Sequence, residues 1–587
     1  MILVFGGTTE GRAAAGVLEE AGTPYYYSTR EAEQVVDLVH GQRISGGMDE
    51  KAILEFCTRH DIRLLVDAGH PFAEELHRTV ADAAERAGMP LVRYERIFPP
   101  HTEDIIWCKD YDDAIRKMEA AGIHRLLALT GVKTIGRLKS FWQKHDCWFR
   151  ILDRDSSRQM AARHGFPKEQ LIEMQTKESG IKDEGFEIST LIASLHPQAI
   201  LTKESGLSGG FQQKVEAALE ADIPVFAVER PKIRWAATVN GPHGLRRAVE
   251  RLLPEFYPLK SGLTTGTCAT AAAVADWHRR QTGETPSEVP VRLPNGETIM
   301  VPVGFSDTFA YCIKDAGDDP DVTNGIEVRA EVKPADHFEI KGGEGVGRFT
   351  LPGFDYPPGE PAINRGPRQM LRENLEGEVA VTISVKNGAE IARRTFNPRL
   401  GIEGGISIIG VSGIVQPYSE EAFLESIRKC MEVAKASGAP RVVIGSGAKS
   451  EKALRDRYPE LPTQAFVQYG NYVGATLQMA ADLGIEAVTV GVMLGKAVKL
   501  AAGQLDTHSR QGTFDRTFLR QLLDEAGCDI DISDITLVRE LWNLLSNEQA
   551  RAFADKVLAY CRVHCQPLLP AGQLTILLID DEGNVWE

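Results

Sequence analysis

The first 255 or so residues alternate short apolar, β-branched runs with stretches of helical character, and this alternation constrains the fold most strongly. The runs include ILVFGG, RLLVDAG, RLLALTG, QAILTKESG and IPVFAVERP. Strands that are regularly followed by helices are typical of parallel sheets with crossover helices. The pattern breaks near residue 100, where IFPPHTED supplies two prolines and polar residues. We therefore expect two Rossmann-like α/β domains in the N-terminal half, over residues 1–100 and 101–256.

A second break lies at LLPEFYPLKSG, residues 252–262, which holds two prolines and a glycine. From there to about residue 400 the chain is rich in Gly and Pro and has only short apolar runs. After residue 400, helical stretches alternate with apolar strands such as RVVIGSG and AVTVGVML. We expect an α+β region over residues 257–400 and an α/β region over residues 401–587.

Charge, hydropathy and cysteine spacing exclude several classes of function. A net charge of −16 does not favour a surface for nucleic acid or anionic lipid. No apolar run approaches the ~18 residues of a membrane span, and the first residues lack the pattern of a signal peptide. The nine cysteines show no metal-ligand spacing, which favours reduced thiols in a cytoplasmic protein without a bound metal. Nothing in the sequence indicates an oligomeric state.

The first strand, ILVF, runs through GGTTEGR into a helix. A glycine loop in this position lets backbone N–H groups approach a phosphate at the helix N-terminus, where the helix dipole favours an anion. The spacing is neither GxGxxG nor a P-loop. Arg12 and Ala13 stand where a P-loop has Lys and Ser or Thr, which argues against hydrolysis of a magnesium nucleotide. A tight turn that only packs the helix on the strand is an equally good interpretation of the loop alone.

Two other segments place polar residues directly after a strand. RLLVDAG leads to HPFAEEL, with Asp67, His70 and Pro71, and TKESGLSGG supplies Lys203 and the loop that follows it. Open α/β folds bind ligands at the carboxyl edge of the sheet, where these residues are expected. Taken alone, a histidine such as His70 is more often a helix cap or a hydrogen-bonded turn residue than a catalyst, and a lysine such as Lys203 is more often a solvated surface charge.

The set GGTTEGR, DAGHPFA, RYER, LTGVK, TKESGLSGG and VERP, in this order, resembles precorrin-6A reductases across nearly all of residues 1–250. The resemblance implies a nicotinamide dinucleotide between two Rossmann-like domains and reduction of one double bond of a macrocycle. Arg30, which ends YYYSTR, then lies where a 2′-phosphate is held, so NADPH is favoured over NADH. His70 and Lys203 become candidates for the proton donor or a carboxylate anchor. The residues expected to bind the cofactor are Gly6, Gly7, Thr8, Glu10, Arg12, Arg30, Ser205 and Gly206.

The C-terminal half carries several motifs, none of which names an activity by itself. The threonines of SGLTTGTCATAAAV suit either a helix cap or a carboxylate site. The acidic loop KDAGDDPDVTNG lacks the ligand spacing of an EF-hand, and Asp319 within it suits ribose hydroxyls or a plain surface turn. Arginines in GEPAINRGPR suit carboxylates through bidentate pairing. In GKAVKLAAGQLDTHSR, Lys496 and Lys499 lie one helical turn apart.

Together with NPRLGIEGGISIIGVSGIV and GNYVG, these motifs resemble the cobalt-precorrin-5B C1-methyltransferase family over residues 258 to about 520. That family uses S-adenosylmethionine and lacks the glycine fingerprint usual in methyltransferases. The resemblance implies that the methyl group passes in line to a ring carbon, a step that needs alignment and desolvation more than an acid or base. The candidate residues are Thr265, Gly266, Asp319 and Asn471 for the cofactor, Arg368, Lys496 and Lys499 for the substrate, and His508 for catalysis.

The two resemblances imply consecutive steps in the biosynthesis of the corrin ring of cobalamin. The second half would methylate cobalt-precorrin-5B to cobalt-precorrin-6A, and the first half would reduce this product to cobalt-precorrin-6B. The expected partners are therefore cobalt-precorrins, NADPH or NADH, and S-adenosylmethionine. One alternative stays open at this point: only one half is active, and the other is a non-catalytic nucleotide-binding or scaffold module.

Overall fold

The chain forms two compact units, each described by itself below. The computed structural model describes residues 1–30, 35–174, 184–233, 235–508 and 514–587. Unit 1 comprises residues 1–260 and 295–299, and unit 2 comprises residues 261–294 and 300–587. None of the helices that the structure describes has both the length and the apolar character that a membrane span needs.

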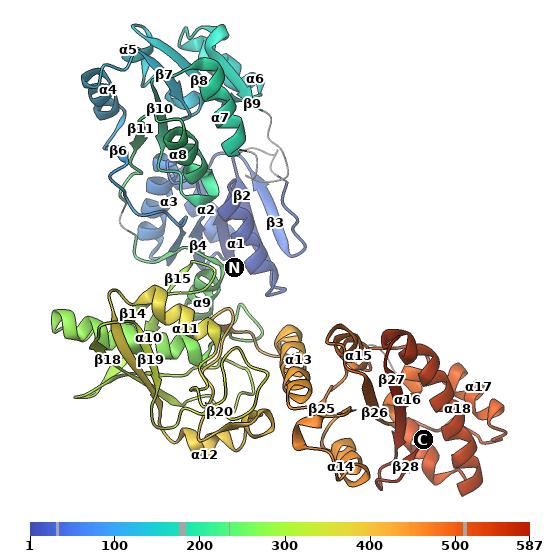
Figure 1. Ribbon diagram of the computed structural model, residues 1–587. Coiled ribbons are helices and arrows are strands. Elements are labelled where there is room, and N and C mark those ends of the chain that lie inside the picture. The colour runs from blue at the N-terminus through green and yellow to red at the C-terminus, as the bar shows by residue number, and fades with distance from the viewer. Residues whose placement is uncertain (31–34, 175–183, 234, 509–513) are drawn as a thin grey trace. The chain divides into compact units, whose positions relative to one another are not determined.

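Unit 1 begins with a six-stranded parallel sheet (Figure 1). Its first strand is completely buried, because helices cover both faces of the sheet. The strand order is β12 (Thr238–Val239), β5 (Leu91–Tyr94), β4 (Leu64–Asp67), β1 (Ile2–Phe5), β2 (Tyr25–Thr29), β3 (Gly41–Ser45). One face carries α1 (Thr9–Glu19) and α9 (Pro242–Leu252), and the other carries α2 (Glu50–Arg59) and α3 (Glu74–Ala87).

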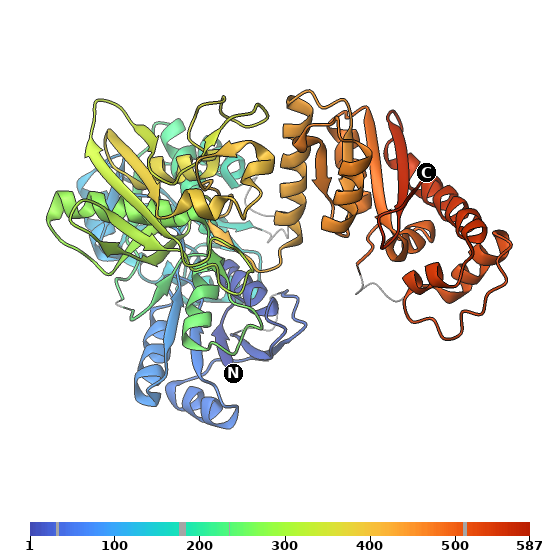
Figure 2. The same cartoon turned by 90° about the horizontal axis from the view of Figure 1, so that it is seen from below.

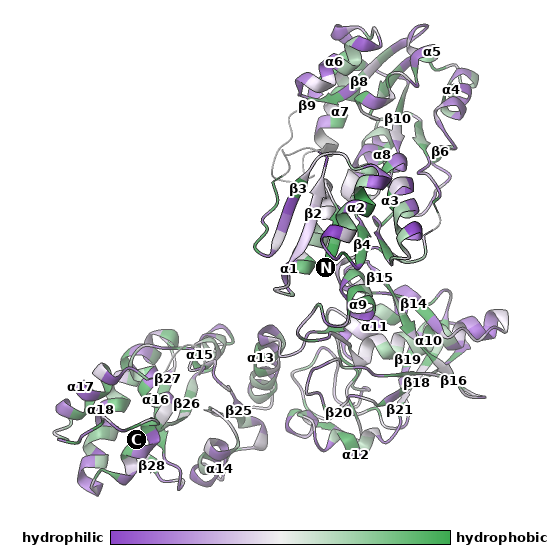
Figure 3. Cartoon of the chain, turned by 180° about the vertical axis from the view of Figure 1, so that it is seen from behind, coloured by the Kyte–Doolittle hydropathy of each residue, from purple (hydrophilic) through white to green (hydrophobic). Residues whose placement is uncertain are grey.

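A second six-stranded parallel sheet completes unit 1, which confirms the prediction of two Rossmann-like domains in the N-terminal half. Figure 3 shows hydrophobic residues along strands of unit 1 such as β4, and polar ones on outer helices such as α4. The strand order in this second sheet is β6 (Ile105–Cys108), β11 (Val225–Val228), β10 (Ala199–Lys203), β7 (Arg125–Ala128), β8 (Asp146–Leu152), β9 (Leu171–Met174). Helices α4 (Tyr111–Ala120), α5 (Lys139–Trp142) and α6 (Asp155–Arg163) cover one face, and α7 (Glu184–Leu195) and α8 (Phe211–Glu220) cover the other.

The second domain ends earlier than the expected residue 256. Strand β12 pairs with β5 of the first sheet, Thr238 opposite Arg93 and Val239 opposite Tyr94. The apolar face of α9 packs into the core of the first sheet. The apolar pattern of α9 predicts a helix but does not tell which sheet the helix covers. The second sheet is therefore an insertion within the first domain.

Residues 295–299 join unit 1 from a distant part of the sequence. Glu297 is 1% exposed, and its carboxylate accepts a hydrogen bond from the backbone N–H of Gly244 at 3.0 Å. The backbone N–H of Thr298 donates to the side chain of Asn240 at 2.8 Å. These bonds hold the segment against the first turn of α9. Unit 1 therefore does not end near the expected boundary at residue 256 but also includes residues 295–299.

The first region of unit 2 packs α10 (Thr265–Thr282) against a mixed sheet, in which β19 and β21 are parallel and the other pairs antiparallel. The order is β16 (Gly304–Phe305), β17 (Ala310–Ile313), β18 (Glu327–Pro334), β21 (Val379–Val385), β19 (Glu339–Gly342). The other elements are α11 (Arg365–Asn374), α12 (Gly388–Ala392) and the strand pairs β14 (Glu288–Arg292) with β15 (Thr298–Pro302), β13 (Gly262–Leu263) with β23 (Ile414–Val415), and β20 (Arg348–Phe349) with β22 (Ile402–Glu403). Because β22 and β23 pair with strands of this region, it extends past the expected boundary at residue 400.

The second region of unit 2 is an α/β layer with helices on both faces of its sheet (Figure 2). The strands are parallel except for the last, in the order β25 (Phe466–Gln468), β24 (Val442–Gly445), β26 (Ala487–Met493), β27 (Gln573–Ile579), β28 (Val585–Trp586). One core contains α13 (Glu420–Ala436), α15 (Val473–Asp482), α16 (Leu494–Ala501), α17 (Arg516–Glu525) and α18 (Asn547–Cys565). Helix α14 (Ala448–Arg457) packs on the other face.

Helix α10 is the buried centre of the first region, and it carries one fully buried carboxylate. Asp276 is 0% exposed and accepts hydrogen bonds from Arg279 at 2.5 Å and from Arg280 at 2.8 Å. It also accepts one from the backbone N–H of Val332 on β18 at 2.8 Å. A buried charge needs such partners, and this one joins the helix to the central strand of the sheet.

Replacing Asp276 by Ala should therefore destabilise unit 2 by about 3 kcal/mol, because a buried ion pair loses one partner. The value lies at the low end of the usual range, since both arginines can still reach solvent. Urea unfolding followed by hydrogen exchange of α10 peptides measures the change. The exposed Asp307→Ala is the matched control and should leave the midpoint in place. An equal shift in both variants would contradict a role for the buried carboxylate.

Candidate functional site

The loop after β1 is built on three glycines. A Cβ at Gly6 would lie 2.2 Å from the Tyr27 ring, and one at Gly11 would lie 2.7 Å from the Cα of Gly6. Gly7 has φ +89°, a conformation that favours glycine, and a Cβ there would meet no atom within 4 Å. The loop thus lies tight against β2 and α1: the backbone N–H of Gly6 donates to the carbonyl of Ser28 at 2.8 Å, and that of Gly7 donates to the Tyr27 hydroxyl at 3.2 Å. The Cα side of Gly7 faces open space.

Thr8 caps α1 and ties the glycine loop to the neighbouring strand. Its Oγ1 accepts a hydrogen bond from the backbone N–H of Gly11 at 2.9 Å and donates one to the carbonyl of Ala68 at 2.7 Å. The first turn of a helix has N–H groups without intrahelical partners and carries the positive end of the helix dipole. The helix end behind the loop of Gly6, Gly7 and Thr8 lies at the carboxyl edge of the first sheet, and such helix ends are favourable positions for an anion.

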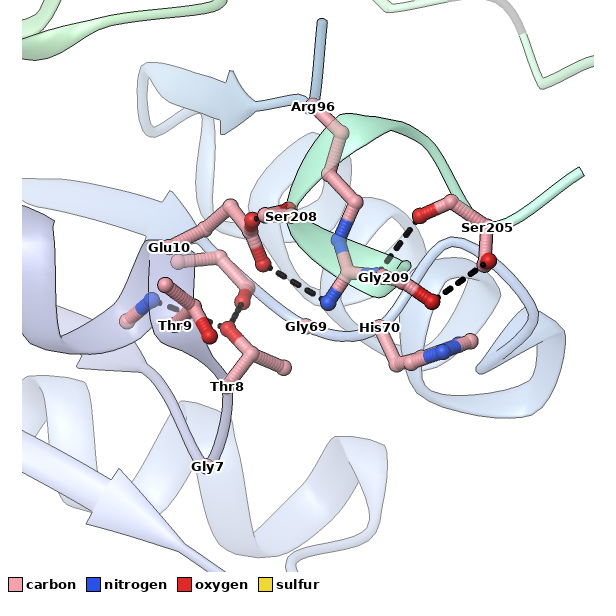
Figure 4. Close-up of polar contacts among 12 residues, drawn as sticks. Gly7, Thr8, Thr9, Glu10, Gly69, His70, Arg96, Ser205, Ser208 and Gly209 are labelled. Carbon is pink, nitrogen blue, oxygen red and sulfur yellow. Dashed lines mark hydrogen bonds and ion pairs between the residues drawn. The ribbon is translucent and has the colours of Figure 1, made fainter. Parts of the chain in front are cut away.

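A buried ion pair connects this loop with the second sheet. Glu10, in the first turn of α1, is 6% exposed and lies 2.9 Å from the guanidinium of Arg96. Its carboxylate also accepts a hydrogen bond from the Ser208 hydroxyl. Arg96 donates to the carbonyl of Ser205 at 2.7 Å, and Figure 4 shows the guanidinium between the two loops. Glu10 was expected to bind the cofactor, and here its carboxylate is held by Arg96 and Ser208.

The loop after β10 wraps around Arg96. Gly206 has φ +74°, and a Cβ there would lie 2.9 Å from the Cβ of Arg96. A Cβ at Gly209 would lie 2.7 Å from the guanidinium. The Ser205 hydroxyl donates to the carbonyl of Gly209 at 3.1 Å. Ser205 and Gly206, both predicted to bind the cofactor, thus shape the loop that faces the first domain.

Asp67 ends β4 at the centre of a buried polar network. It is 0% exposed and is bonded to Nδ1 of His77 at 2.6 Å and to Arg93 at 2.9 Å. Burial acts to raise the pKa of Asp67, but the His77 hydrogen bond and the Arg93 charge outweigh it and hold the pKa below its usual range. Nε2 of His77 lies 3.0 Å from the carbonyl of His70. The network therefore fixes the backbone that carries His70.

The His70 imidazole is held in its neutral form. Its Nδ1 accepts a hydrogen bond from the backbone N–H of Phe72 at 3.2 Å, which leaves the proton of the neutral ring on Nε2. Burial, followed by the positive charges of Lys203 and Arg96, lowers the pKa of His70 to about 3. At neutral pH this ring can donate a hydrogen bond from Nε2 but carries no charge.

Lys203, at the end of β10, lies near the segment that carries His70 and Phe72. Its ammonium is 5.3 Å from the centre of the Phe72 ring. Burial, with smaller contributions from Lys214 and Lys133, lowers the pKa of Lys203 to about 8. The amine is thus mostly protonated at pH 7 and releases its proton more easily than an ordinary lysine, a property typical of a general acid.

Arg12 and Arg30 lie on the exposed rim of the glycine loop. The Arg12 guanidinium donates to the Thr9 hydroxyl at 3.4 Å, and Arg30 directly follows β2. Neither guanidinium is buried. Their position is compatible with phosphates bound at the edge of the first sheet.

Arg96, His77 and Ser208 were not selected from the sequence, although each has a central role in the geometry. Arg96 lies in RYER and Ser208 in the glycine-rich loop, so both belong to motifs that carry the resemblance. Only the presence of these residues in the ordered set of motifs could have pointed to them. Their contacts could not be predicted, because their partners lie far away in the sequence. His77 sits on the buried face of α3, where periodicity alone predicts only packing.

In unit 2, the predicted Thr265 and Gly266 form the first turn of α10. The Thr265 hydroxyl is 3.3 Å from the carbonyls of Ser407 and Ile409 and accepts from the backbone N–H of Ile409 at 2.9 Å. A Cβ at Gly266 would lie 2.7 Å from the ring of Pro367. This hydroxyl is therefore engaged with the backbone of residues 407–409, and its expected contact with the cofactor stays a prediction.

Asp319 and Arg368, two further predicted residues of unit 2, also have hydrogen-bond partners within the protein. The Asp319 carboxylate accepts from the backbone N–H of Tyr418 at 3.1 Å. Arg368, on α11, donates to the carbonyl of Ile363 at 2.8 Å and pairs with Glu360 at 3.1 Å. Both side chains thus have structural partners in addition to any ligand they bind.

A second group of predicted residues gathers at the carboxyl edge of the α/β layer. The Lys496 amine donates to the carbonyl of Gly470, and that of Lys499 to the carbonyl of His508 at 3.4 Å. Burial, and then the charge of Lys499, lower the pKa of Lys496. The carbonyl of Asn471 accepts from Thr507, while its amide side chain bonds to no residue that the structure describes. The structure thus brings Asn471, Lys496, Lys499 and His508 together.

Comparison with known families agrees with this division of the chain. Residues 1–250 match the family model "Precorrin-6x reductase CbiJ/CobK". Residues 254–417 match the model CbiD, and residues 506–586 match its C-terminal domain. The cobalt-precorrin-5B C(1)-methyltransferase of Prosthecochloris aestuarii is 44% identical over 345 residues, which are 55% of this chain and 94% of that protein. The enzyme of the same name from Pseudomonas putida is 37% identical over 56% of this chain and 95% of that protein.

Two solved structures are similar to parts of the chain. A CobK precorrin-6A reductase aligns with 44% of this chain and 98% of its own, with 19% identity and a TM-score of 0.36. The CbiD cobalamin biosynthesis protein of Archaeoglobus fulgidus aligns with 43% of this chain and 84% of its own, with 30% identity and a TM-score of 0.26.

The environment of His70 predicts a histidine that does not titrate near neutrality. With its pKa lowered to about 3, the ring should show no shift of its Cε1 signal between about pH 8 and pH 5. NMR of histidine-labelled protein measures this, and loss of the signal in His70→Gln assigns it. In Lys203→Met the midpoint should move upward, because one nearby positive charge is removed. A midpoint near the ordinary value of about 6.5 would show that the ring is solvated.

Proposed function

The chain belongs to the cobalt-precorrin-5B C(1)-methyltransferase family with a precorrin-6x reductase fused ahead of it, and we propose that it catalyses two consecutive steps of corrin biosynthesis. Unit 2 methylates cobalt-precorrin-5B, and unit 1 reduces the product, cobalt-precorrin-6A, to cobalt-precorrin-6B. The observation that carries this proposal is the presence of both families, one after the other, in a single chain. The match to 94% of a methyltransferase supports an entire enzyme in the second part.

In unit 1 the cofactor is a nicotinamide dinucleotide, which supplies a hydride when bound. Its pyrophosphate fits the open space beside Gly7 and the N-terminus of α1 that Thr8 caps. Arg12 lies close enough to this helix end to contact a phosphate. Arg30, at the end of β2, is placed to bind a ribose 2′-phosphate, so NADPH is favoured over NADH.

The protein supplies the proton and the alignment for the reduction. Lys203 gives a proton to the ring atom that does not receive the hydride, and its lowered pKa reduces the cost of this transfer. Neutral His70 donates a hydrogen bond from Nε2, which orients the substrate beside the ammonium. Asp67 and His77 keep the His70 backbone in place. The lysine then regains a proton from water, which completes the cycle.

In unit 2 the cofactor is S-adenosylmethionine, which supplies the methyl group from its sulfonium when bound. The amide of Asn471, which bonds to none of the described residues, and the amines of Lys496 and Lys499 suit polar groups of the cofactor or substrate. His508 lies beside Lys499 and remains a candidate for catalysis. Asp319, Gly266 and Thr265 remain candidates for cofactor contact, although the Thr265 hydroxyl also bonds to the backbone of the fold.

The purified protein, incubated anaerobically with cobalt-precorrin-5B, S-adenosylmethionine and NADPH, should yield a product that has gained one methyl group and two hydrogens. Mass spectrometry detects both gains. Leaving out NADPH should stop the reaction at the methylated product, and leaving out S-adenosylmethionine should stop it entirely. A product that gains a methyl group but never the hydrogens would mean that unit 1 is not a reductase for this ring.

Replacing Lys203 by Met should slow the reduction by roughly 10²- to 10⁴-fold, the usual contribution of a general acid, and leave methylation unchanged. The wild-type rate of reduction should be constant below and fall above about pH 8, as the amine loses its proton. This alkaline limb should be absent in the residual activity of the variant. Lys232→Met, which removes an exposed amine paired with Glu229, is the control. An unchanged pH profile in Lys203→Met would exclude Lys203 as the proton donor.

A further inference from the structure

Helix α11 in unit 2 presents three arginines on one face. Arg365, Arg368 and Arg372 are spaced by three and four residues, so their side chains lie on the same side of the helix. The opposite side is apolar and buried, with Pro367 and Met370 in the core. The arginine face is therefore fixed in direction by the packing of the helix.

The three arginines line one wall of a pocket of about 340 Å³. The other lining residues are Phe338, Ile340, Tyr356 and Gln369, and we call the whole set the arginine pocket. Ile340 lies on β19, and Phe338 immediately precedes this strand. Aromatic and aliphatic walls with a few placed polar groups are the usual composition of a site for a small organic ligand.

Aromatic rings hold two of the guanidinium groups in place, but their acidic partners are half-exposed and neutralise their charge only weakly. Arg368 lies 3.9 Å from the centre of the Tyr356 ring and Arg372 lies 4.8 Å from that of Phe338, so both are held against aromatic rings. Their acidic partners, Glu360 and Glu378, are each 44% exposed. Such half-exposed pairs are weak and exchange readily for a better carboxylate.

Arg365 differs from the other two because its guanidinium has no ion pair or hydrogen bond with any residue that the structure describes. The pocket thus contains three positive charges, and among the residues that the structure describes only those of Arg368 and Arg372 have an acidic partner. A guanidinium suits a carboxylate through two parallel hydrogen bonds. The charge and geometry favour a ligand with more than one carboxylate.

An exposed apolar loop adjoins the first turn of the same helix. Ile409 is 48% exposed and Val411 73% exposed. A Cβ at Gly366 would lie 2.6 Å from the carbonyl of Gly410, which brings this loop directly against α11. Thr265 anchors the loop through its hydroxyl. Neighbouring apolar side chains that are held in solvent are typical of a surface that binds a ligand.

We propose that the arginine pocket binds carboxylate groups of an otherwise apolar ligand, whose body lies on the loop of residues 409–411. This inference rests on the proposed function and names the ligand as the carboxylate-bearing rim of the corrinoid substrate. The pocket is too small for a whole macrocycle but has room for two short carboxylate side chains at its edge. The single carboxylate of S-adenosylmethionine stands beside an ammonium group, which suits three guanidinium groups less well.

The test uses the full chain and cobyrinic acid, a stable corrin with several free carboxylates, as the probe. Wild-type protein should bind it and should not bind its methyl ester, which keeps the ring but lacks the charges. Arg365→Ala should weaken binding by roughly ten- to a hundredfold, the usual effect of losing one charged hydrogen bond. Arg365→Lys should weaken it less. Added salt should weaken binding in the wild type more than in Arg365→Ala.

Arg394→Ala removes another exposed arginine of unit 2 and should bind the probe as the wild type does. Arg368 is unsuitable for the first test because it also supports the backbone at Ile363. Equal binding by wild type and Arg365→Ala, or equal losses in Arg365→Ala and Arg394→Ala, would overturn the proposal. Loss of S-adenosylmethionine with normal binding of cobyrinic acid would assign the pocket to the carboxylate of the cofactor instead.

The outcome also separates this inference from the proposed function. If the wild type methylates cobalt-precorrin-5B but Arg365→Ala has an unchanged KM for it, the pocket assignment fails and the function stands. If methylation is absent while arginine-dependent binding of cobyrinic acid remains, the site stands and the reaction must be sought elsewhere.

Discussion

The ion pair between Glu10 and Arg96 is the constraint on which the candidate site of unit 1 depends. It joins the first turn of α1, the chain that leaves β5, and the loop after β10. Both side chains are buried, so loss of either would leave an uncompensated charge at a cost of about 3–5 kcal/mol. Through this pair the glycine loop of one sheet faces the loop that follows β10 of the other.

The sequence predicted those parts of unit 1 that depend on residues close together in the chain, such as the first strand and the loop after it. The apolar strand and the three glycines act within a few residues of one another, and the tight loop between strand and helix forms as expected. The return of β12 to the first sheet could not be read in the same way, because the strand has only two residues. The role of Arg96 was also hidden, since its partners come from both ends of the unit.

Unit 2 shows the same limit more strongly. Thr265 has the features of a ligand-binding hydroxyl in the sequence, yet its bonds go to the backbone at residues 407 and 409, which no local pattern reveals. Arg368 was expected to hold carboxylates, but its sequence position could not show that it shares a pocket with Arg365 and Arg372. The grouping of Lys496, Lys499 and His508 was foreseeable, because they lie on one helix and the loop after it.

The insertion of the second sheet into the first domain has a consequence for synthesis of the chain. Strand β5 is made early, but its outer neighbour β12 and the covering helix α9 follow only after the whole second sheet. While the ribosome adds the intervening residues, β5 is an unpaired edge beside an uncovered apolar face, the kind of surface that promotes aggregation. The apolar face and the free edge of the first domain thus stay exposed until the second sheet has been synthesised. We expect such a chain to need chaperone protection during translation more than a protein whose domains follow one another in sequence.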